Sequence, residues 1–212
     1  MKPKAIFFDV DGTIIPLDVA IKTFQETLKH FNINLPINKN TIRMFIGYRI
    51  VQIIPRFIPQ VIPFEREFLY HFQETQIKNF KRYSELLPYV SSTFRKIKRR
   101  KIKIGIVTTK RRIEAESILK GYRLPYDTLV GNDDVKNIKP NPEPVFKACK
   151  NLKVKPKDCI FIGDHAFDMQ AAKSAGCIAV GVLTGWGNRK NLECAGADYI
   201  IKDLKELTKL IE

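Results

Sequence analysis

The sequence predicts an α/β protein in which a doubly wound parallel sheet carries an all-helical insertion. From residue 89 onward, short apolar segments alternate with amphipathic ones, as is typical of strands and helices that take turns along a chain. Between residues 16 and 83, apolar residues recur only at helical spacing. We therefore expect a Rossmann-like core formed by residues 1–15 and 84–212, and a helical cap domain formed by residues 16–83.

The first strand is expected at Ala5–Phe8, where four apolar residues are typical of a buried strand in a parallel sheet. Asp9 and Asp11 follow it. Residues at i and i+2 of an extended segment face the same way, so these carboxylates converge, and Gly12 allows a sharp turn. Two such charges repel each other unless a cation or a proton intervenes, which indicates a hard metal such as Mg²⁺. An ordinary strand followed by an Asp-Gly turn is the alternative.

Helices are expected in the insertion from the spacing of its apolar residues. One begins after Thr13 and ends near Asn32, a second begins around Asn40, and a third covers residues 65–83. Between them, residues 53–64 carry a proline at every fourth position. Because proline disrupts a regular helix, we expect a series of short turns there.

The remainder of the chain predicts five further strands and five further helices. The strands are expected at 102–107, 128–130, 159–162, 177–182 and 199–201. The helices are expected at 89–100, 112–120, 142–152, 168–175 and 204–211.

Composition favours a folded globule, because 44% of the 212 residues are hydrophobic. No apolar run approaches the length of a membrane span, and the start of the chain lacks the apolar core of a signal peptide. We therefore expect a cytoplasmic protein without a membrane partner. The four cysteines show no CxxC spacing, so we expect reduced core residues rather than disulfides or a zinc site.

The formal net charge of +15 indicates an anionic partner, because basic proteins attract phosphate groups on metabolites or nucleic acids. The densest basic run covers residues 95–112. A solvated helix end and loop is the favoured interpretation of this run. A nucleic-acid-binding surface stays open as the alternative.

Further polar residues follow the later strands, at the edge of the sheet where catalytic groups gather in this class of fold. Thr108, Thr109 and Lys110 follow one strand, and a segment containing Asp164 and Asp168 follows another. Lys139 stands before a proline-rich helix start. Taken singly, Thr108 could merely end a strand, Lys139 could be a surface charge, and Asp168 could cap a helix.

As an ordered set, these residues resemble the haloacid dehalogenase (HAD) superfamily of hydrolases. The family pattern is DxDGT, a Ser or Thr after a strand, a Lys, and GDxxxD, and all four occur here in order, from Asp9 to Asp168. The segments 107–110 and 139–142 are most similar to the phosphoglycolate phosphatase-like group. Residues 84–90 lack the Pro-Gly turn of many relatives, which leaves specificity open.

The resemblance implies a phosphatase mechanism. Asp9 would attack phosphorus and form an aspartyl-phosphate, while Asp11 would act first as general acid and then as general base. Thr108 would donate a hydrogen bond to a phosphoryl oxygen, and Lys139 would offset negative charge.

The resemblance also implies a Mg²⁺ site. Asp9, Asp164 and the main-chain carbonyl of Asp11 would bind the ion, and Asp168 would support it directly or through water. His165 is expected to be a spectator, and Trp186 to be either a core-edge aromatic or part of the rim of the site.

The predicted function is therefore a magnesium-dependent phosphatase of a small phosphate ester, with phosphoglycolate as the first candidate. The alternatives are a phosphomutase or a pyrophosphatase on the same core, or a basic nucleic-acid-binding protein that has kept a phosphatase core. A monomer or a homodimer is expected. The candidate substrate-binding residues are Gly12, Thr109, Lys110, Gly47 and Arg49.

Overall fold

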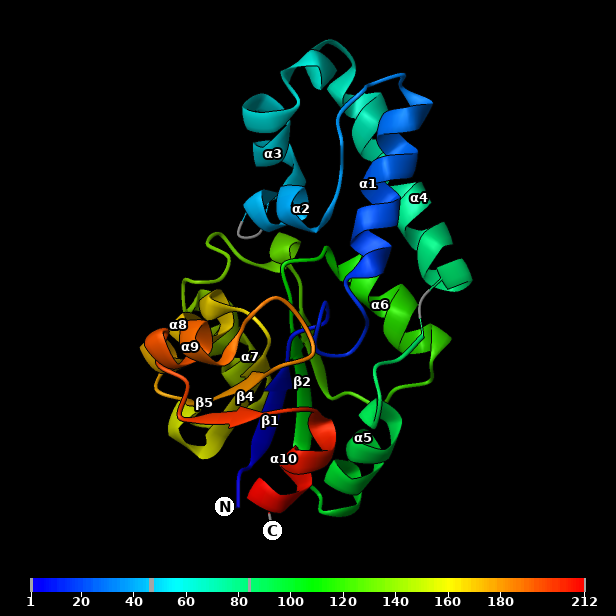
Figure 1. The fold of residues 1–212 in the computed structure, drawn as a ribbon. Helices are drawn as coiled ribbons and strands as arrows, with labels where there is room; N and C mark the ends of the chain where they lie inside the picture. Colours follow the sequence, from blue (N-terminus) through cyan, green and yellow to red (C-terminus); the bar gives the residue numbers. More distant parts are fainter. Residues whose placement is uncertain (1, 46–47, 84, 212) are drawn as a thin grey trace. The chain divides into compact units, whose positions relative to one another are not determined.

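The core of the protein is a six-stranded parallel sheet in the order β3-β2-β1-β4-β5-β6 (Figure 1). The structure is a computed structural model that describes residues 2–45, 48–83 and 85–211. The strands are β1 (Ala5–Phe8), β2 (Lys103–Val107), β3 (Thr128–Val130), β4 (Cys159–Gly163), β5 (Ile178–Val182) and β6 (Tyr199–Ile201). Every pairing is parallel, with Phe8 opposite both Ile106 and Ile162, so β1 lies at the centre.

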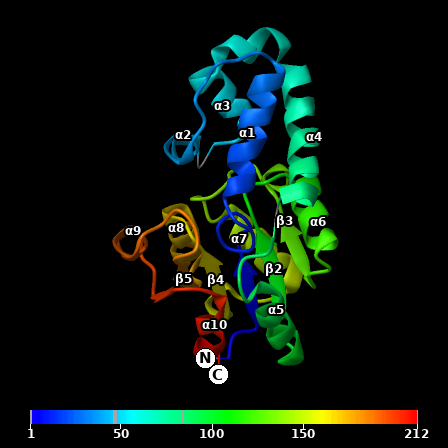
Figure 2. The ribbon, with the colours of Figure 1, turned by 45° about the vertical axis from the view of Figure 1, so that its right-hand side comes forward.

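Helices cover both faces of the sheet because alternate side chains of each strand point to opposite faces. One face packs on α7 (Glu143–Leu152) and α8 (Ala166–Ala175), and the other on α5 (Val90–Arg99) and α10 (Leu204–Leu210) (Figures 1 and 2). The helix α6 (Arg112–Gly121) lies beside β3, and α9 (Arg189–Cys194) beside β5 and β6. Two single 3₁₀ turns, Asn132–Asp134 and Pro156–Asp158, complete the core. The predicted fold class is confirmed.

The chain divides into two compact units, one formed by Met1–Pro16 with Glu85–Glu212 and the other by Leu17–Ser84. These boundaries differ by one residue from the predicted ones. Over its described residues, 17–45 and 48–83, the second unit contains helices and no strand: α1 (Asp18–His30), α2 (Lys39–Phe45), α3 (Ile50–Phe57), the 3₁₀ helix η1 (Pro59–Phe64) and α4 (Glu65–Tyr83).

An aromatic cluster forms the interior of the helical unit. Phe24 of α1 contacts Phe45 of α2 and Phe72 of α4, with ring centroids 5.0 and 4.8 Å apart. The helices α1 and α4 lie side by side along much of their length (Figure 2). The apolar stripe that predicted the first helix is therefore the one that holds this unit together.

The proline-rich segment differs from its prediction. Instead of short turns throughout, residues 50–57 form the helix α3 with Pro55 inside it, and residues 59–64 form η1. Pro55 removes one hydrogen bond inside the helix, and the next turn is still closed by the bond from Ile58 N to Ile54 O (3.0 Å). Pro59 stands in the first turn of η1, where no donor is needed.

Two other features of the core were not predicted. The helix α9 was missed because only one of its side chains, Leu192, is buried. Cys194 at its end is exposed, so the expectation of a core residue is wrong there, whereas Cys149, Cys159 and Cys177 are buried free thiols. Among the described residues, no helix is both long and apolar enough to cross a membrane.

Candidate active site

Side chains from several loops meet at the carboxyl ends of the central strands. Because all strands are parallel, the loops that follow β1, β2 and β4 emerge at the same edge of the sheet. Asp9 follows β1 and is fixed by a hydrogen bond from its backbone N–H to Ile162 O (3.0 Å). Thr108 follows β2, and Asp164 follows β4.

Lys139 lies at the centre of this group and is only 4% exposed. Its Nζ donates to Asp9 Oδ1 (2.8 Å), to Asp168 Oδ1 (2.6 Å) and to Val107 O (3.2 Å). Burial alone would lower the pKa of Lys139, but the two carboxylates outweigh it and raise the pKa above its usual value. The alternative interpretation of Lys139 as a surface charge is therefore wrong.

Three buried carboxylates, those of Asp9, Asp164 and Asp168, form a group in which one oxygen from each lies within 4.8 Å of the other two. Burial and mutual repulsion raise the pKa of Asp164, and burial raises the pKa of Asp168 to about 6 despite the contact with Lys139. When all three acids are ionised, Lys139 compensates only one charge. The remaining two negative charges and the all-oxygen donor set fit one divalent cation such as Mg²⁺.

Asp164 is held by the loop after β5, which contains Trp186, expected either at the core edge or at the rim of the site. The backbone N–H of Trp186 donates to Asp164 Oδ2 (2.8 Å), and a Cβ on Gly185 or Gly12 would collide with the same carboxylate. Gly12 also adopts a φ of +74°, which favours glycine. The hydroxyl of Thr184 donates to Gly12 O (2.6 Å) and so ties the loop after β5 to the loop after β1.

Asp11 faces a second buried cation. Lys110 Nζ lies 2.9 Å from Asp11 Oδ2, and Lys110 is 6% exposed. The other oxygen, Oδ1, is buried and has no hydrogen-bond partner among the described residues. Burial raises the pKa of Asp11, and Lys110 opposes this effect. The Asp11 side chain is therefore not part of the three-carboxylate group.

Glu114 is a further buried acid on the same side, on the first turn of α6. It accepts a hydrogen bond from the backbone N–H of Arg111 (3.1 Å). Burial raises the pKa of Glu114, while the charge of Lys110 lowers it. Glu114 was not among the predicted site residues, because only its position near a helix start distinguishes it in the sequence.

The two threonines after β2 have different surroundings. Thr108 is buried, and its Oγ1 accepts a hydrogen bond from the backbone N–H of Lys110 (3.2 Å). Thr109 is half-buried, and its carbonyl accepts from Asn132 Nδ2 (2.6 Å). Of these two threonines, therefore, only Thr108 is buried.

Asp168 caps a helix start, as one interpretation predicted, and it also contacts Lys139; its role in metal binding stays a prediction. One carboxylate oxygen contacts Lys139, and the other accepts from the backbone N–H of His165 (3.0 Å) at the start of α8. The Nδ1 atom of His165 accepts from Phe167 N (3.2 Å), so His165 caps the helix.

Two of the predicted substrate-binding residues, Gly47 and Arg49, belong to the helical unit. Gly47 lies outside the described residues. Arg49 precedes α3 in extended backbone, and its N–H donates to Gln52 Oε1 (2.9 Å). Their roles in substrate binding stay predictions.

Taken together, the fold and the site define a hydrolase of the doubly wound α/β class that has a carboxylate at the end of its central strand. Comparison with known proteins agrees. Residues 6–182 match the family model described as haloacid dehalogenase-like hydrolase. The chain therefore belongs to the haloacid dehalogenase-like hydrolases, and the expectation of a hydrolase of this family, of the phosphatase kind, is confirmed.

Several relatives match over the full length of the chain. Pyrophosphatase PpaX of Bacillus mycoides is 29% identical over 100% of this chain and 98% of that protein. Pyrophosphatase PpaX of Oceanobacillus iheyensis is 28% identical over the same shares. A crystal structure from Haemophilus somnus, described as a predicted phosphoglycolate phosphatase, has a TM-score of 0.86 and 26% identity, covering 100% of this chain and 99% of that one.

The glycine at position 185 provides a test of the cation site. Gly185→Ala should weaken Mg²⁺ binding by about 10- to 100-fold, because its Cβ would displace the Asp164 carboxylate. Isothermal titration calorimetry measures the affinity. Gly121→Ala is the matched control, since nothing lies within 4 Å of its Cβ. Equal affinities in the two variants would contradict the assignment of Asp164.

The stability of the metal-free protein should depend on pH through Asp168. Its folded-state pKa of about 6 lies above the usual value near 4, so the folded state binds a proton that the unfolded state releases. This contribution to the unfolding free energy should fall by about 2 kcal/mol as pH rises from about 4 to about 7.

Urea unfolding in the presence of a chelator, compared between the wild type and Asp168→Asn, measures this difference. Asp158→Asn is the control with the opposite sign, because Lys4 lowers the pKa of the exposed Asp158 and its contribution is lost as pH falls. A pH-independent difference between the wild type and Asp168→Asn would rule out the raised pKa.

Proposed function

We propose that the chain is a magnesium-dependent phosphatase that hydrolyses a small phosphate ester through a phosphoryl group carried on Asp9. The observation that supports this most strongly is the buried contact of Lys139 with Asp9 at the end of β1. An ionised carboxylate beside a fixed ammonium group can approach a phosphate dianion, which would otherwise repel it.

In the first step, a carboxylate oxygen of Asp9 forms a bond to phosphorus as the bond between phosphorus and the leaving oxygen breaks. Asp11 gives its proton to that leaving oxygen. The raised pKa of Asp11 supports this role, because a carboxyl group must hold a proton near neutral pH to act as an acid.

In the second step, water attacks the phosphorus of the aspartyl-phosphate. Asp11, now ionised, accepts the proton of this water, and the bond from phosphorus to the Asp9 oxygen breaks. Inorganic phosphate leaves and the Asp9 carboxylate is restored. Thr108 donates a hydrogen bond to a phosphoryl oxygen, and Lys139 holds the Asp9 carboxylate in place throughout.

A Mg²⁺ ion would be held by Asp9, Asp164 and the main-chain carbonyl of Asp11, with support from Asp168, and it would offset the charge on the phosphoryl oxygens. Gly12, Thr109 and Lys110 are proposed to border the bound phosphate. Gly47 and Arg49 are proposed to contribute to recognition of the rest of the substrate.

Two substrates are favoured by the relatives. Phosphoglycolate is the first candidate, supported by the segments 107–110 and 139–142 and by the name of the Haemophilus somnus structure. Inorganic pyrophosphate is the second, supported by the name of the full-length PpaX relatives. Both are small anions that carry a phosphoryl group close to a second negative group, so one site with the same lysines and a bound cation could accept either.

The covalent intermediate can be tested with an activated ester such as p-nitrophenyl phosphate. Because its leaving group departs without a proton, Asp11→Asn should still form the aspartyl-phosphate but hydrolyse it at least about 100-fold more slowly. Rapid quenching followed by mass spectrometry should then detect a phosphorylated Asp9. Asp9→Asn should give neither phosphoenzyme nor turnover, and a phosphoenzyme in that variant would refute the role of Asp9.

A substrate panel separates the proposed activities. Phosphate release from phosphoglycolate and from pyrophosphate should differ by at least about 10-fold in kcat/KM, because a pocket that hydrogen-bonds the distal group of one substrate leaves polar groups unpaired with the other. Product analysis in the presence of sugar phosphates detects a mutase. Transfer without release of phosphate would contradict a hydrolase, and equal activity of Asp9→Asn would end the proposal.

A further inference from the structure

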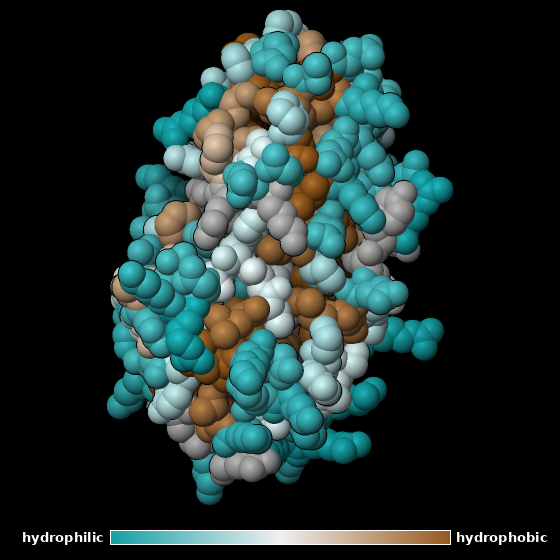
Figure 3. Space-filling model, in the orientation of Figure 1, coloured by the Kyte–Doolittle hydropathy of each residue, from teal (hydrophilic) through white to brown (hydrophobic). Residues whose placement is uncertain are grey.

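The edge of the sheet opposite the candidate active site is strongly basic. This amino-terminal edge consists of residues 2–4, 98–103, 123–127, 153–158, 173–178 and 196–199, which lead into the six strands. It belongs entirely to the core unit. Its exposed cations include Lys2, Arg99, Lys101, Lys153, Lys155 and Lys157. In Figure 3, hydrophilic side chains project around the lower end of the core, where β1 begins in Figure 1.

The acids on this edge do not neutralise those cations. Each of its three acids already forms an ion pair with another basic residue. The pairs are Lys4–Asp158 (2.8 Å), Lys98–Asp127 (2.7 Å) and Lys173–Asp198 (2.6 Å). None of the ion pairs found among the described residues involves the six exposed cations above. The edge therefore keeps an excess positive charge.

Two hollows lie on the same edge, and each is bordered by a pair of cations. One, of about 330 Å³, is bordered by Lys2 and Arg100 at the starts of β1 and β2. The other, of about 350 Å³, is bordered by Lys157 and Lys173 at the starts of β4 and β5. Hollows of this size accept a ring or a nucleotide rather than a bare ion.

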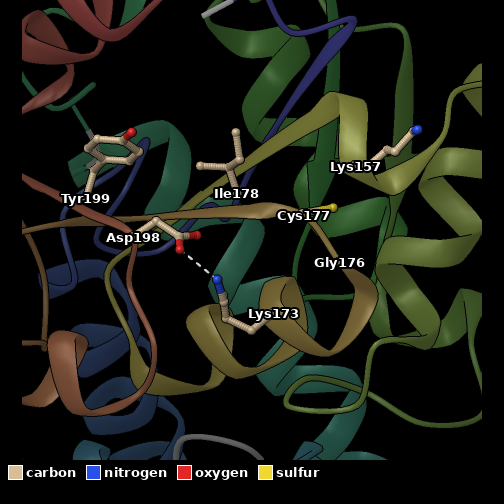
Figure 4. A pocket seen from close by; sticks show the side chains of 7 residues that line it. All are labelled: Lys157, Lys173, Gly176, Cys177, Ile178, Asp198 and Tyr199. Carbon is tan, nitrogen blue, oxygen red and sulfur yellow. Dashed lines mark hydrogen bonds and ion pairs between the residues drawn. The ribbon is translucent and has the colours of Figure 1, made fainter.

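The second hollow also presents an aromatic ring. Tyr199, the first residue of β6, is 42% exposed. Figure 4 shows its ring and Lys157 on opposite sides of the hollow, with Ile178 between them and the Lys173–Asp198 pair below. An exposed aromatic face beside cations provides a stacking surface for a base and a contact for its phosphate.

We propose that the amino-terminal edge binds single-stranded nucleic acid. Neighbouring strands lie about 4.8 Å apart, so the loops that lead into them place their cations in a row across the sheet, which suits one phosphate backbone rather than the two of a duplex. The hollows and the ring of Tyr199 can accept bases. A flat membrane surface has no groups that would enter them. This site is independent of the proposed catalytic chemistry.

The binding can be measured by fluorescence anisotropy of a short labelled oligouridine over a series of salt concentrations. The logarithm of affinity should fall linearly with the logarithm of salt concentration. The double variant Lys155→Glu/Lys157→Glu should reduce the slope by about 1.4, which corresponds to two lost phosphate contacts. Tyr199→Ala should weaken binding about fivefold or more at every salt concentration.

The matched control is Lys190→Glu/Lys202→Glu, which makes the same change in charge at exposed positions that follow β5 and β6. It should bind like the wild type. All variants should keep the hydrolase activity of the wild type, so a failure of this proposal is distinct from a failure of the catalytic one.

Three results would overturn the proposal. The first is no binding at low salt, and the second is an equal loss in the control and in the Lys155/Lys157 variant. The third is competition by inorganic polyphosphate, by duplex DNA or by vesicles of anionic lipid that matches competition by the unlabelled single strand. In that case the edge would respond to charge alone.

Discussion

The buried contact of Lys139 with Asp9 and Asp168 is the constraint on which the remaining structure of the core depends. Isolated charges are costly to bury, and removal of one partner leaves the others uncompensated. The three residues come from three separate segments of the chain, which follow β1, precede α7 and begin α8. They can meet only when β1 pairs with β4 and when α7 and α8 pack on the same face of the sheet. Correct assembly of the sheet and assembly of the charged cluster are therefore one event.

The two edges of the sheet carry opposite electrostatic character. The carboxyl edge gathers Asp9, Asp11, Asp164 and Asp168, whereas the amino edge gathers lysine and arginine side chains. The overall charge of +15 attracts anions to the molecule, but the carboxylates at the site repel them locally. The divalent cation proposed for this site would offset that repulsion. The basic run at residues 95–112 is likewise divided between the edges, since Lys101 leads into β2 while Lys110 contacts Asp11 beyond its end.

Much of this arrangement could be read from side-chain chemistry, and the remainder could not. Continuous apolar segments identified the strands, and the ordered acids, threonine and lysine identified Asp9, Thr108, Lys139 and Asp164 as one group. Trp186 was expected either at the core edge or at the rim of the site, but its contact with Asp164 was not predicted, because the donor is a backbone N–H that every residue but proline carries. The helix α3 was not predicted because it contains Pro55, and proline inside a segment usually predicts a break in the helix. The pairing of Lys110 with Asp11 depends on a tertiary contact that spacing along the chain does not encode.

The central position of β1 has a consequence for synthesis of the chain. Its residue Ala5 pairs with Lys103 on one side and with Cys159 on the other, so the first strand to leave the ribosome waits longest for its neighbours. The helical unit of residues 17–84 is complete before either neighbour exists, and its aromatic interior can assemble from local contacts. During that interval the apolar strand β1 has no partner on either side. An unpaired apolar strand can associate with other chains, so β1 is the segment of the nascent protein most exposed to aggregation.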